Sequence, residues 1–181
     1  GERGVEGKIL SAQYARENNI PCLGICYGMQ CMAVEFARNV LKYSDAHSTE
    51  INPQTPHNVI DVMDEQKSML NLDGGVRLGA YDCKLDKKSL AYAVYGKEVI
   101  KERHRHRFEF NNSFRKEMEE NGLCFSGIDV ETNLVEIIEL PSHPWYMGVQ
   151  FHPEYSSTVI NPHPLFVDFI KKAIENKQFK K

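Results

Sequence analysis

Apolar side chains recur along this chain with two periods, one typical of helices and one typical of strands. Residues 7–19 (GKILSAQYARENN) place apolar and small side chains near helical spacing and end on two asparagines, which predicts a helix. The short apolar run 20–26 (IPCLGIC) is typical of a buried parallel strand, and helical spacing returns over 29–41 (MQCMAVEFARNVL). The order helix, strand, glycine turn, helix indicates a layered α/β fold.

The remainder of the chain also mixes strands and helices. Residues 52–58 have the composition of a loop, whereas 76–85 and 98–110 read as extended segments, expected to pair as strands. A helix is expected over 113–122. Three short strands and a closing amphipathic helix follow, at residues 123–130, 134–140, 145–151 and 163–177. The pattern therefore predicts a mixed α/β fold around a central sheet.

Composition narrows the class of protein only modestly. The chain has 181 residues, 41% of them hydrophobic and 26% charged, an ordinary balance for one soluble domain. Its net charge of -3 gives no electrostatic reason to expect nucleic acid or an anionic membrane, and no apolar run approaches the ~20 residues that span a bilayer. The sequence begins without methionine and without a recognisable signal peptide, so we expect it to be part of a longer polypeptide.

The cysteines are odd in number, irregularly spaced and without a CxxC pair. This pattern argues against a disulfide framework, disfavours a structural zinc site and favours a reducing, cytoplasmic setting. The five are Cys22, Cys26, Cys31, Cys83 and Cys124.

One cysteine stands between two glycines, in the stretch Gly24-Ile-Cys26-Tyr-Gly28. A strand that enters a helix through such a turn places its middle residue at the helix N-terminus, where unpaired N–H groups and the macrodipole favour negative charge. We therefore expect the pKa of the Cys26 thiol to be lowered. The spacing is consistent with a nucleophile on an elbow, but taken alone it is a weak signal that a buried cysteine beside a glycine turn also explains.

His152 stands out among the histidines by its position. It follows the apolar segment YMGVQF, and the catalytic groups of open α/β sheets gather at the carboxyl ends of strands. Glu154 lies two residues further on, and in an extended segment such positions point to the same side. A carboxylate beside an imidazole is the third member of a catalytic triad. The alternative is a strand-end turn without catalytic function.

The other histidines have plainer interpretations. Three of them lie in polar, loop-like segments and are expected to be solvated: His47, His57 and His163. In the segment RHRHR, a period of two places His104 and His106 on one face of a strand and Arg103, Arg105 and Arg107 on the other. Such a strand could bind nucleic acid or a metal. The segment lacks interleaved aromatic residues and the chain is acidic, which argues against nucleic-acid binding.

Two motifs carry a resemblance to a known family. PCLGICYGMQ and GVQFHPEY resemble the class I glutamine amidotransferases. Further stretches (GERGVEGKI, AHSTE, VRLGAYDC, ERHRHRFEFN and HPLFVDFIKKA) extend the resemblance nearly end to end and place the chain in the branch that aminates UTP. The resemblance implies a flavodoxin-like, three-layer fold over residues 1–181, with a central, mostly parallel sheet flanked by helices.

The resemblance also implies roles for individual residues. Cys26 would be the nucleophile, His152 the general base and acid, and Glu154 the orienting carboxylate. The Tyr27 N–H would donate to the oxyanion, Glu50 would hold the α-amino group of glutamine, and Arg107 its α-carboxylate. The implied glutamine-binding set is Tyr27, Gly28, Met29, Gln30, Glu50 and Arg107. Two positions depart from the family, which usually has leucine in place of Tyr27 and tyrosine in place of Phe108.

The same resemblance sets expectations beyond this chain. The family's glycine-rich loop, with the second oxyanion donor, would precede Gly1 together with the leading strands of the domain. No metal or cofactor is expected here. ATP, Mg²⁺ and the effector GTP would act on an N-terminal synthetase domain of the full-length enzyme, expected to be a homotetramer. Three alternatives remain open: a related amidotransferase such as GMP synthase, a catalytically silent regulatory module, and a cysteine protease.

Overall fold

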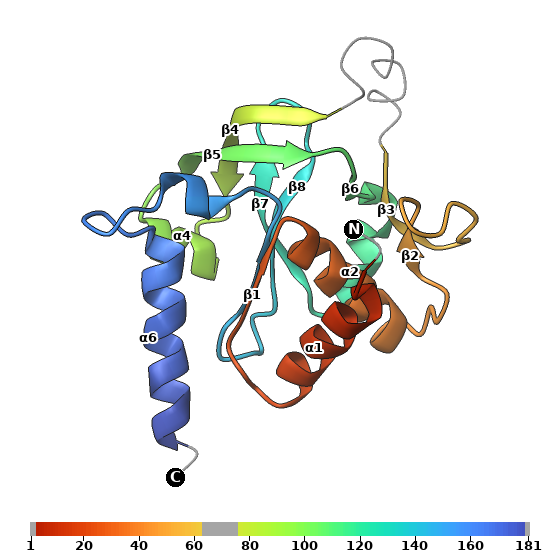
Figure 1. Cartoon of the computed structure of the whole chain (residues 1–181), viewed down its shortest axis with the longest axis horizontal. Coiled ribbons are helices and arrows are strands. Elements are labelled where there is room, and N and C mark those ends of the chain that lie inside the picture. Colours follow the sequence, from red (N-terminus) through yellow and green to blue (C-terminus); the bar gives the residue numbers. More distant parts are fainter. Residues whose placement is uncertain (1–2, 63–75, 180–181) are drawn as a thin grey trace.

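The fold is built around a six-stranded sheet (Figure 1), seen in a computed structural model that describes residues 3–62 and 76–179. Its strands lie in the order β1-β9-β8-β7-β4-β5. Their bounds are β1 Cys22–Ile25, β4 Arg77–Leu85, β5 Val99–His106, β7 Cys124–Asp129, β8 Val135–Glu139 and β9 Tyr146–Val149. The strands predicted from the sequence are therefore confirmed, including the pairing of β4 with β5.

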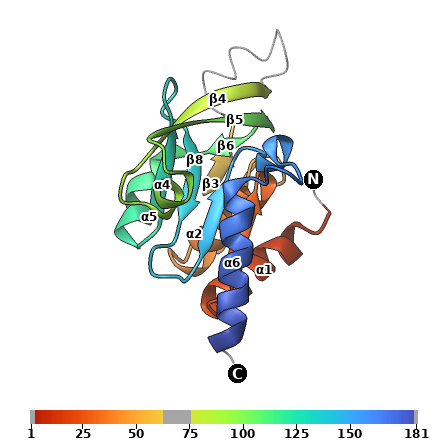
Figure 2. The same cartoon turned by 90° about the vertical axis from the view of Figure 1, so that its left-hand side faces the viewer.

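Helices cover both faces of this sheet, which confirms the predicted three-layer α/β architecture (Figures 1 and 2). Helices α1 and α2 pack on one face, and α4 and α6 on the other. The helical segments are α1 Val5–Glu17, α2 Tyr27–Asn39, α4 Leu90–Tyr95, α5 Arg115–Glu120 and α6 Pro164–Phe179, with 3-10 turns at η1 Asn112–Phe114 and η2 Pro153–Ser156. Among the described residues, none of these helices is long and apolar enough to cross a membrane.

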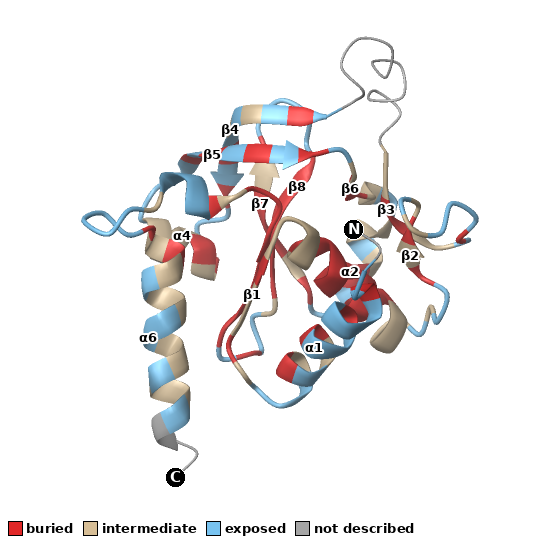
Figure 3. Ribbon diagram, viewed as in Figure 1, coloured by how far each residue is buried: buried red, intermediate tan, exposed pale blue. Residues whose placement is uncertain are grey.

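Neighbouring residues of the central strands contribute to different cores. Tyr146 of β9 packs with α1 and α2, whereas Met147 packs with α4 and α6. Ile137 and Ile138 of β8 divide in the same way. This two-sided burial explains why these strands read as continuous apolar runs (Figure 3). Helix α6 is anchored by Trp145, whose Nε1 donates to Asp168 Oδ2 at 2.7 Å.

The sheet is mixed rather than mostly parallel over the described residues. The predicted parallel strand β1 pairs with β9 in parallel register, but the other four pairs are antiparallel. Strands β7, β8 and β9 follow one another through short connections, and parallel pairing needs a crossover of a dozen or more residues. The expectation of a mostly parallel sheet therefore holds only at the β1–β9 edge.

A second, three-stranded sheet stands beside α2. It comprises β2 His47–Ser48, β3 Asn58–Asp61 and β6 Glu109–Phe110. Since β6 follows β5 after only two residues, the chain passes directly from the large sheet to the small one at Arg107 and Phe108.

Helix α4 was not predicted from the sequence. Its six residues are too few to show a helical period, yet both ends are well defined. The Ser89 side chain accepts from the Tyr92 N–H at 3.0 Å, and Gly96 ends the helix in the left-handed conformation with φ 64°.

Candidate active site

Cys26 lies at the elbow between β1 and α2, as predicted. Its N–H donates to the Val149 carbonyl at 2.7 Å, and its own carbonyl accepts from the Gln30 N–H at 3.3 Å. The positive φ of 52° falls on Cys26 itself, a conformation that non-glycine residues seldom adopt. Strain held at one residue by well-bonded neighbours is typical of functional sites.

The two glycines around Cys26 have different structural roles. A Cβ at Gly24 would approach the Gly28 carbonyl carbon to 2.8 Å and would also meet Met32, so this position needs glycine for α2 to lie close to β1. A Cβ at Gly28 would meet nothing within 4 Å. The close approach of helix to strand therefore depends on Gly24.

The sulfur of Cys26 is a protonated thiol at rest. Burial raises the pKa of Cys26 to about 11, while smaller opposing contributions come from the hydrogen bonds of the Tyr27 N–H and the Gln150 amide to the sulfur. The prediction of a lowered pKa is wrong for the free site, because the loss of hydration outweighs the helix N-terminus. Reaction at this sulfur consequently needs a base.

His152 and Glu154 come together as predicted, but through a different backbone conformation. The Nδ1 of His152 lies 2.6 Å from Oε1 of Glu154, and the two residues belong to the start of the 3-10 turn η2 instead of an extended segment. Because β1 and β9 are parallel neighbours, Cys26 and His152 both follow the carboxyl ends of paired strands. The His152 N–H is fixed to the Arg103 carbonyl at 2.8 Å.

A cavity of about 360 Å³ opens beside Cys26 where the two sheets meet. Glu50 and Arg107 both line it and are both exposed, so the cavity presents one carboxylate and one guanidinium. The predicted residues on its wall are Cys26, Tyr27, Gln30, Glu50 and Arg107, and the residues not predicted are Val76, Arg105, His106 and Phe108.

Comparison with known proteins assigns the family. The family described as class I glutamine amidotransferase matches residues 1–172. This chain is a class I glutamine amidotransferase. The CTP synthase of Bacteroides fragilis is 61% identical over 175 residues, which cover 97% of this chain and 33% of that protein. The chain thus spans about a third of the length of the curated relatives it matches.

Solved structures give the same assignment. The glutaminase domain of Trypanosoma brucei CTPS, determined with bound acivicin, superposes with a TM-score of 0.91 at 38% identity and covers 97% of this chain and 68% of that one. A Thermoplasma acidophilum protein described as part of a GMP synthase superposes with a TM-score of 0.60 at 16% identity, over 97% of this chain and 68% of that one, which shows a shared fold alone. The amidotransferase domain here is therefore of the CTP synthase type.

Two residues predicted to bind glutamine do not line the Cys26 cavity of the amidotransferase. Met29 is fully buried and packs against Gly148, and Gly28 faces a separate groove of about 450 Å³ along α1 and β1. Phe108 contributes its carbonyl, which accepts from Gln30 and lies 3.2 Å from His106 Nδ1. These backbone contacts do not depend on the missing tyrosine hydroxyl. Gly1 lies outside the described residues.

A buried ionic cluster lies behind the cavity of the amidotransferase, and it was not predicted. Arg77 of β4 contacts Glu136 at 2.6 Å, Asp129 at 2.8 Å and Glu109 at 3.4 Å. Burial raises the pKa of Glu136 to about 7 and holds that of Glu109 well above its usual range. The only sequence signal was the occurrence of glutamates within apolar strands such as VEIIE, where a buried charge needs a partner.

The alternating segment RHRHR behaves as predicted, with buried histidines and exposed arginines. His104 Nδ1 and His106 Nε2 are 2.8 Å apart, and burial lowers the pKa of His104 to about 3. The prediction that His163 is solvated is wrong, since His163 is buried and its Nε2 lies 2.8 Å from Glu102 Oε1. Among the residues described, no group of three or more His, Cys, Asp or Glu side chains could hold a metal ion.

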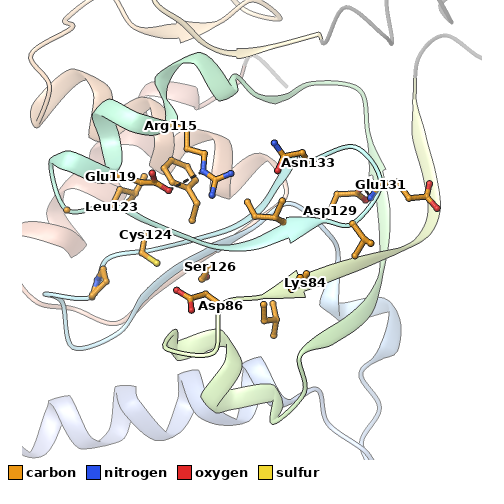
Figure 4. Close-up of a pocket in the computed structure, with 16 residues that line it drawn as sticks. Lys84, Asp86, Arg115, Glu119, Leu123, Cys124, Ser126, Asp129, Glu131 and Asn133 are labelled. Atoms are coloured by element: carbon orange, nitrogen blue, oxygen red, sulfur yellow. Dashed lines mark hydrogen bonds and ion pairs between the residues drawn. The ribbon is translucent and has the colours of Figure 1, made fainter.

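A larger groove of about 870 Å³ lies away from Cys26, between α5, β7 and β4 (Figure 4). Its polar side chains serve local structure: Arg115 pairs with Glu119 at 3.1 Å, and Asp129 caps the turn at Thr132. Burial raises the pKa of Cys124 in this groove to about 11. Size alone thus does not identify the reactive site.

Proposed function

We propose that this chain hydrolyses L-glutamine to glutamate and ammonia as the glutaminase part of a CTP synthase. The observation that carries the proposal is the arrangement at the carboxyl ends of β1 and β9. Cys26 follows one strand and lines the cavity, and the His152–Glu154 pair follows the other strand. A thiol, an imidazole and an orienting carboxylate are the parts of a nucleophilic triad.

The cavity supports a free amino acid as substrate. A guanidinium fork suits a carboxylate and a carboxylate suits an ammonium, so Arg107 would bind the α-carboxylate and Glu50 the α-amino group. Together they would direct the side-chain amide of glutamine toward Cys26. A cysteine protease fits less well, because a peptide offers neither free group at its scissile bond.

In the first half-reaction His152 accepts the proton of the Cys26 thiol, and the sulfur attacks the amide carbon of glutamine. The resulting oxyanion accepts a hydrogen bond from the Tyr27 N–H. His152 then returns the proton to the amide nitrogen, the C–N bond breaks, and ammonia leaves behind a γ-glutamyl thioester on Cys26. A second oxyanion donor would come from a glycine-rich segment preceding Gly1.

In the second half-reaction His152 removes a proton from water, whose oxygen attacks the thioester carbon. The C–S bond breaks, the proton passes from His152 to the Cys26 sulfur, and glutamate is released. Glu154 holds the imidazole at Nδ1 through both halves, which leaves Nε2 for proton transfer and stabilises the imidazolium.

The ammonia would be used by the remainder of the full-length enzyme. We propose ATP- and Mg²⁺-dependent amination of UTP to CTP by an N-terminal synthetase domain, with GTP as effector, in a cytoplasmic homotetramer. The 61% identity to a CTP synthase, against 16% to the GMP synthase protein, favours UTP over XMP as acceptor. Assay of the full-length protein with each nucleotide discriminates the two.

The first test is alkylation by a chloroketone analogue of glutamine, with and without excess glutamine, mapped by mass spectrometry over all five cysteines. Selective modification of Cys26 that glutamine prevents is the expected result. Equal and unprotected labelling of Cys26 and Cys124 would contradict the proposal. So would a Cys26→Ala variant of the full-length enzyme that releases ammonia from glutamine at the parent rate.

A further inference from the structure

A buried glutamine donates a hydrogen bond to the sulfur of Cys26. Gln150 immediately follows β9 and is fully buried. Its Nε2 lies 3.6 Å from the Cys26 sulfur, within hydrogen-bond range for sulfur. An amide side chain buried against a thiol has lost its water and needs defined partners.

A second glutamine determines which end of the Gln150 amide meets the sulfur. Gln30 Nε2 lies 2.9 Å from the Phe108 carbonyl, an acceptor only, so the NH₂ group of Gln30 must occupy that position. The same NH₂ group lies 3.1 Å from Gln150, which must therefore present its oxygen there. It follows that the NH₂ group of Gln150 faces Cys26.

Both glutamines are also held by their backbones. The Gln150 N–H donates to the Glu136 carbonyl of β8 at 2.8 Å, and the Gln30 N–H donates to the Cys26 carbonyl at 3.3 Å. The chain of contacts runs from Phe108 through Gln30 and Gln150 to the sulfur. Phe108 and Gln150 belong to segments other than the one that carries Cys26, and Gln30 lies in the first turn of α2.

We propose that Gln30 and Gln150 form an amide relay that positions the Cys26 sulfur and stabilises its thiolate, an inference that rests on the proposed role of Cys26 as nucleophile. The relay moves no proton and only donates hydrogen bonds. A thiolate accepts such a bond more strongly than a thiol or a thioester sulfur does. The donor therefore helps the sulfur both when it attacks and when it leaves. Gln30 acts on the sulfur through Gln150 and is a positioning residue in the relay.

The test compares the pH profiles of Cys26 alkylation by iodoacetamide in this chain. The variants are Gln150→Met and Gln30→Met, which keep the side-chain length without the NH₂ group. Gln54→Met, at an exposed position, is the matched control. Cys124 in the same sample is the internal reference, quantified in the same peptide map.

Removal of the donor should move the Cys26 profile to higher pH, with alkylation about three- to tenfold slower at each pH from 7 to 9.5 and an unchanged slope. Gln30→Met should shift it in the same direction by less, since the Gln150 amide is then free to turn. Cys124 and Gln54→Met should be unchanged.

Two results would overturn the relay. One is an unchanged profile in both variants, and the other is faster alkylation at lower pH, which would mean that the glutamines only shield the thiol. Thermal unfolding of each variant identifies any loss of fold, and that loss would also accelerate alkylation. Failure of glutamine to protect Cys26 in the parent chain would refute the proposed function instead, because the pH shift is measured without substrate.

Discussion

The Nδ1 of His152 lies 2.6 Å from Oε1 of Glu154 across the first residues of a 3-10 turn. The two residues are separated only by Pro153, whose fixed φ limits how far the carboxylate can move from the ring. The imidazole is therefore held in one orientation before any substrate arrives. The orientation of the ring relative to the carboxylate is thus set within a local turn, and the Arg103 carbonyl holds that turn against β5.

Substitution of His152 should lower the rate of glutamine hydrolysis more than substitution of Glu154. His152→Ala removes the proposed general base and acid and should lower glutamine turnover by about 10²–10⁴-fold. Glu154→Gln keeps the shape but cannot stabilise an imidazolium, so we expect a smaller loss in kcat with little change in KM. Steady-state ammonia release by the full-length enzyme measures both. Equal activity of the parent and His152→Ala would exclude the proposed base.

Arg107 should govern substrate binding more than chemistry. Arg107→Lys replaces a bidentate fork by a point charge, which should raise KM for glutamine about tenfold with kcat nearly unchanged. Arg103→Lys is the matched control, because Arg103 is an exposed arginine of β5, four residues before Arg107, and does not line the cavity. An identical KM in the two variants would argue against carboxylate binding by Arg107.

The two glycines of the elbow should respond oppositely to alanine. Gly24→Ala places a methyl group against the Gly28 backbone and should lower the free energy of unfolding by about 1–3 kcal/mol. Gly28→Ala meets open space within α2 and should leave it unchanged or raise it by up to about 1 kcal/mol. Urea denaturation of both variants measures the difference, and equal stabilities would contradict the packing described.

The buried Glu136 should make stability depend on pH. Its pKa rises from 4.5 to about 7 in the folded state, so the folded chain holds a proton that the unfolded chain releases. The stabilisation is complete below pH 4.5 and is lost as pH rises to about 7. Relative to Glu136→Gln, the parent should lose about 1–3 kcal/mol of unfolding free energy across that range.

The comparison with Glu136→Gln isolates this titration from its surroundings. Arg77, Asp129 and Glu109 face Glu136 from other strands. His104 of β5 also faces Glu136, and His106 contacts His104. These groups are present in both proteins. Urea unfolding at pH 5, 6, 7 and 8 gives the two curves, and a constant difference between them would refute the raised pKa.

Local sequence patterns predicted most of the fold. The strand, elbow and helix around Cys26 were recognisable because a short apolar run, a glycine turn and a helical period follow one another. The alternation of buried His104 with exposed Arg103 was recognisable because a strand has a period of exactly two. Helix α4 was not, since six residues held by a cap show no period.

Contacts between distant segments could not be predicted in the same way. Gln30 and Gln150 are 120 residues apart, and nothing in the composition of either segment indicates that their amides meet. The buried Arg77 likewise draws its carboxylates from three other strands. The raised pKa of Cys26 depends on how much water the folded chain removes, which the motif around it does not encode.

Gly24 and Gly148 face each other in the parallel register of β1 and β9, and a Cβ on Gly148 would approach Met29 of α2 to 2.9 Å. The height of α2 above the sheet is thus set by two glycines, which carry no side chain. That height also fixes the position of the Tyr27 N–H, the proposed oxyanion donor. Attempts to make the domain more heat-resistant by replacing glycines with alanine would, at these two sites, move the helix away from the sheet and also displace the proposed oxyanion donor.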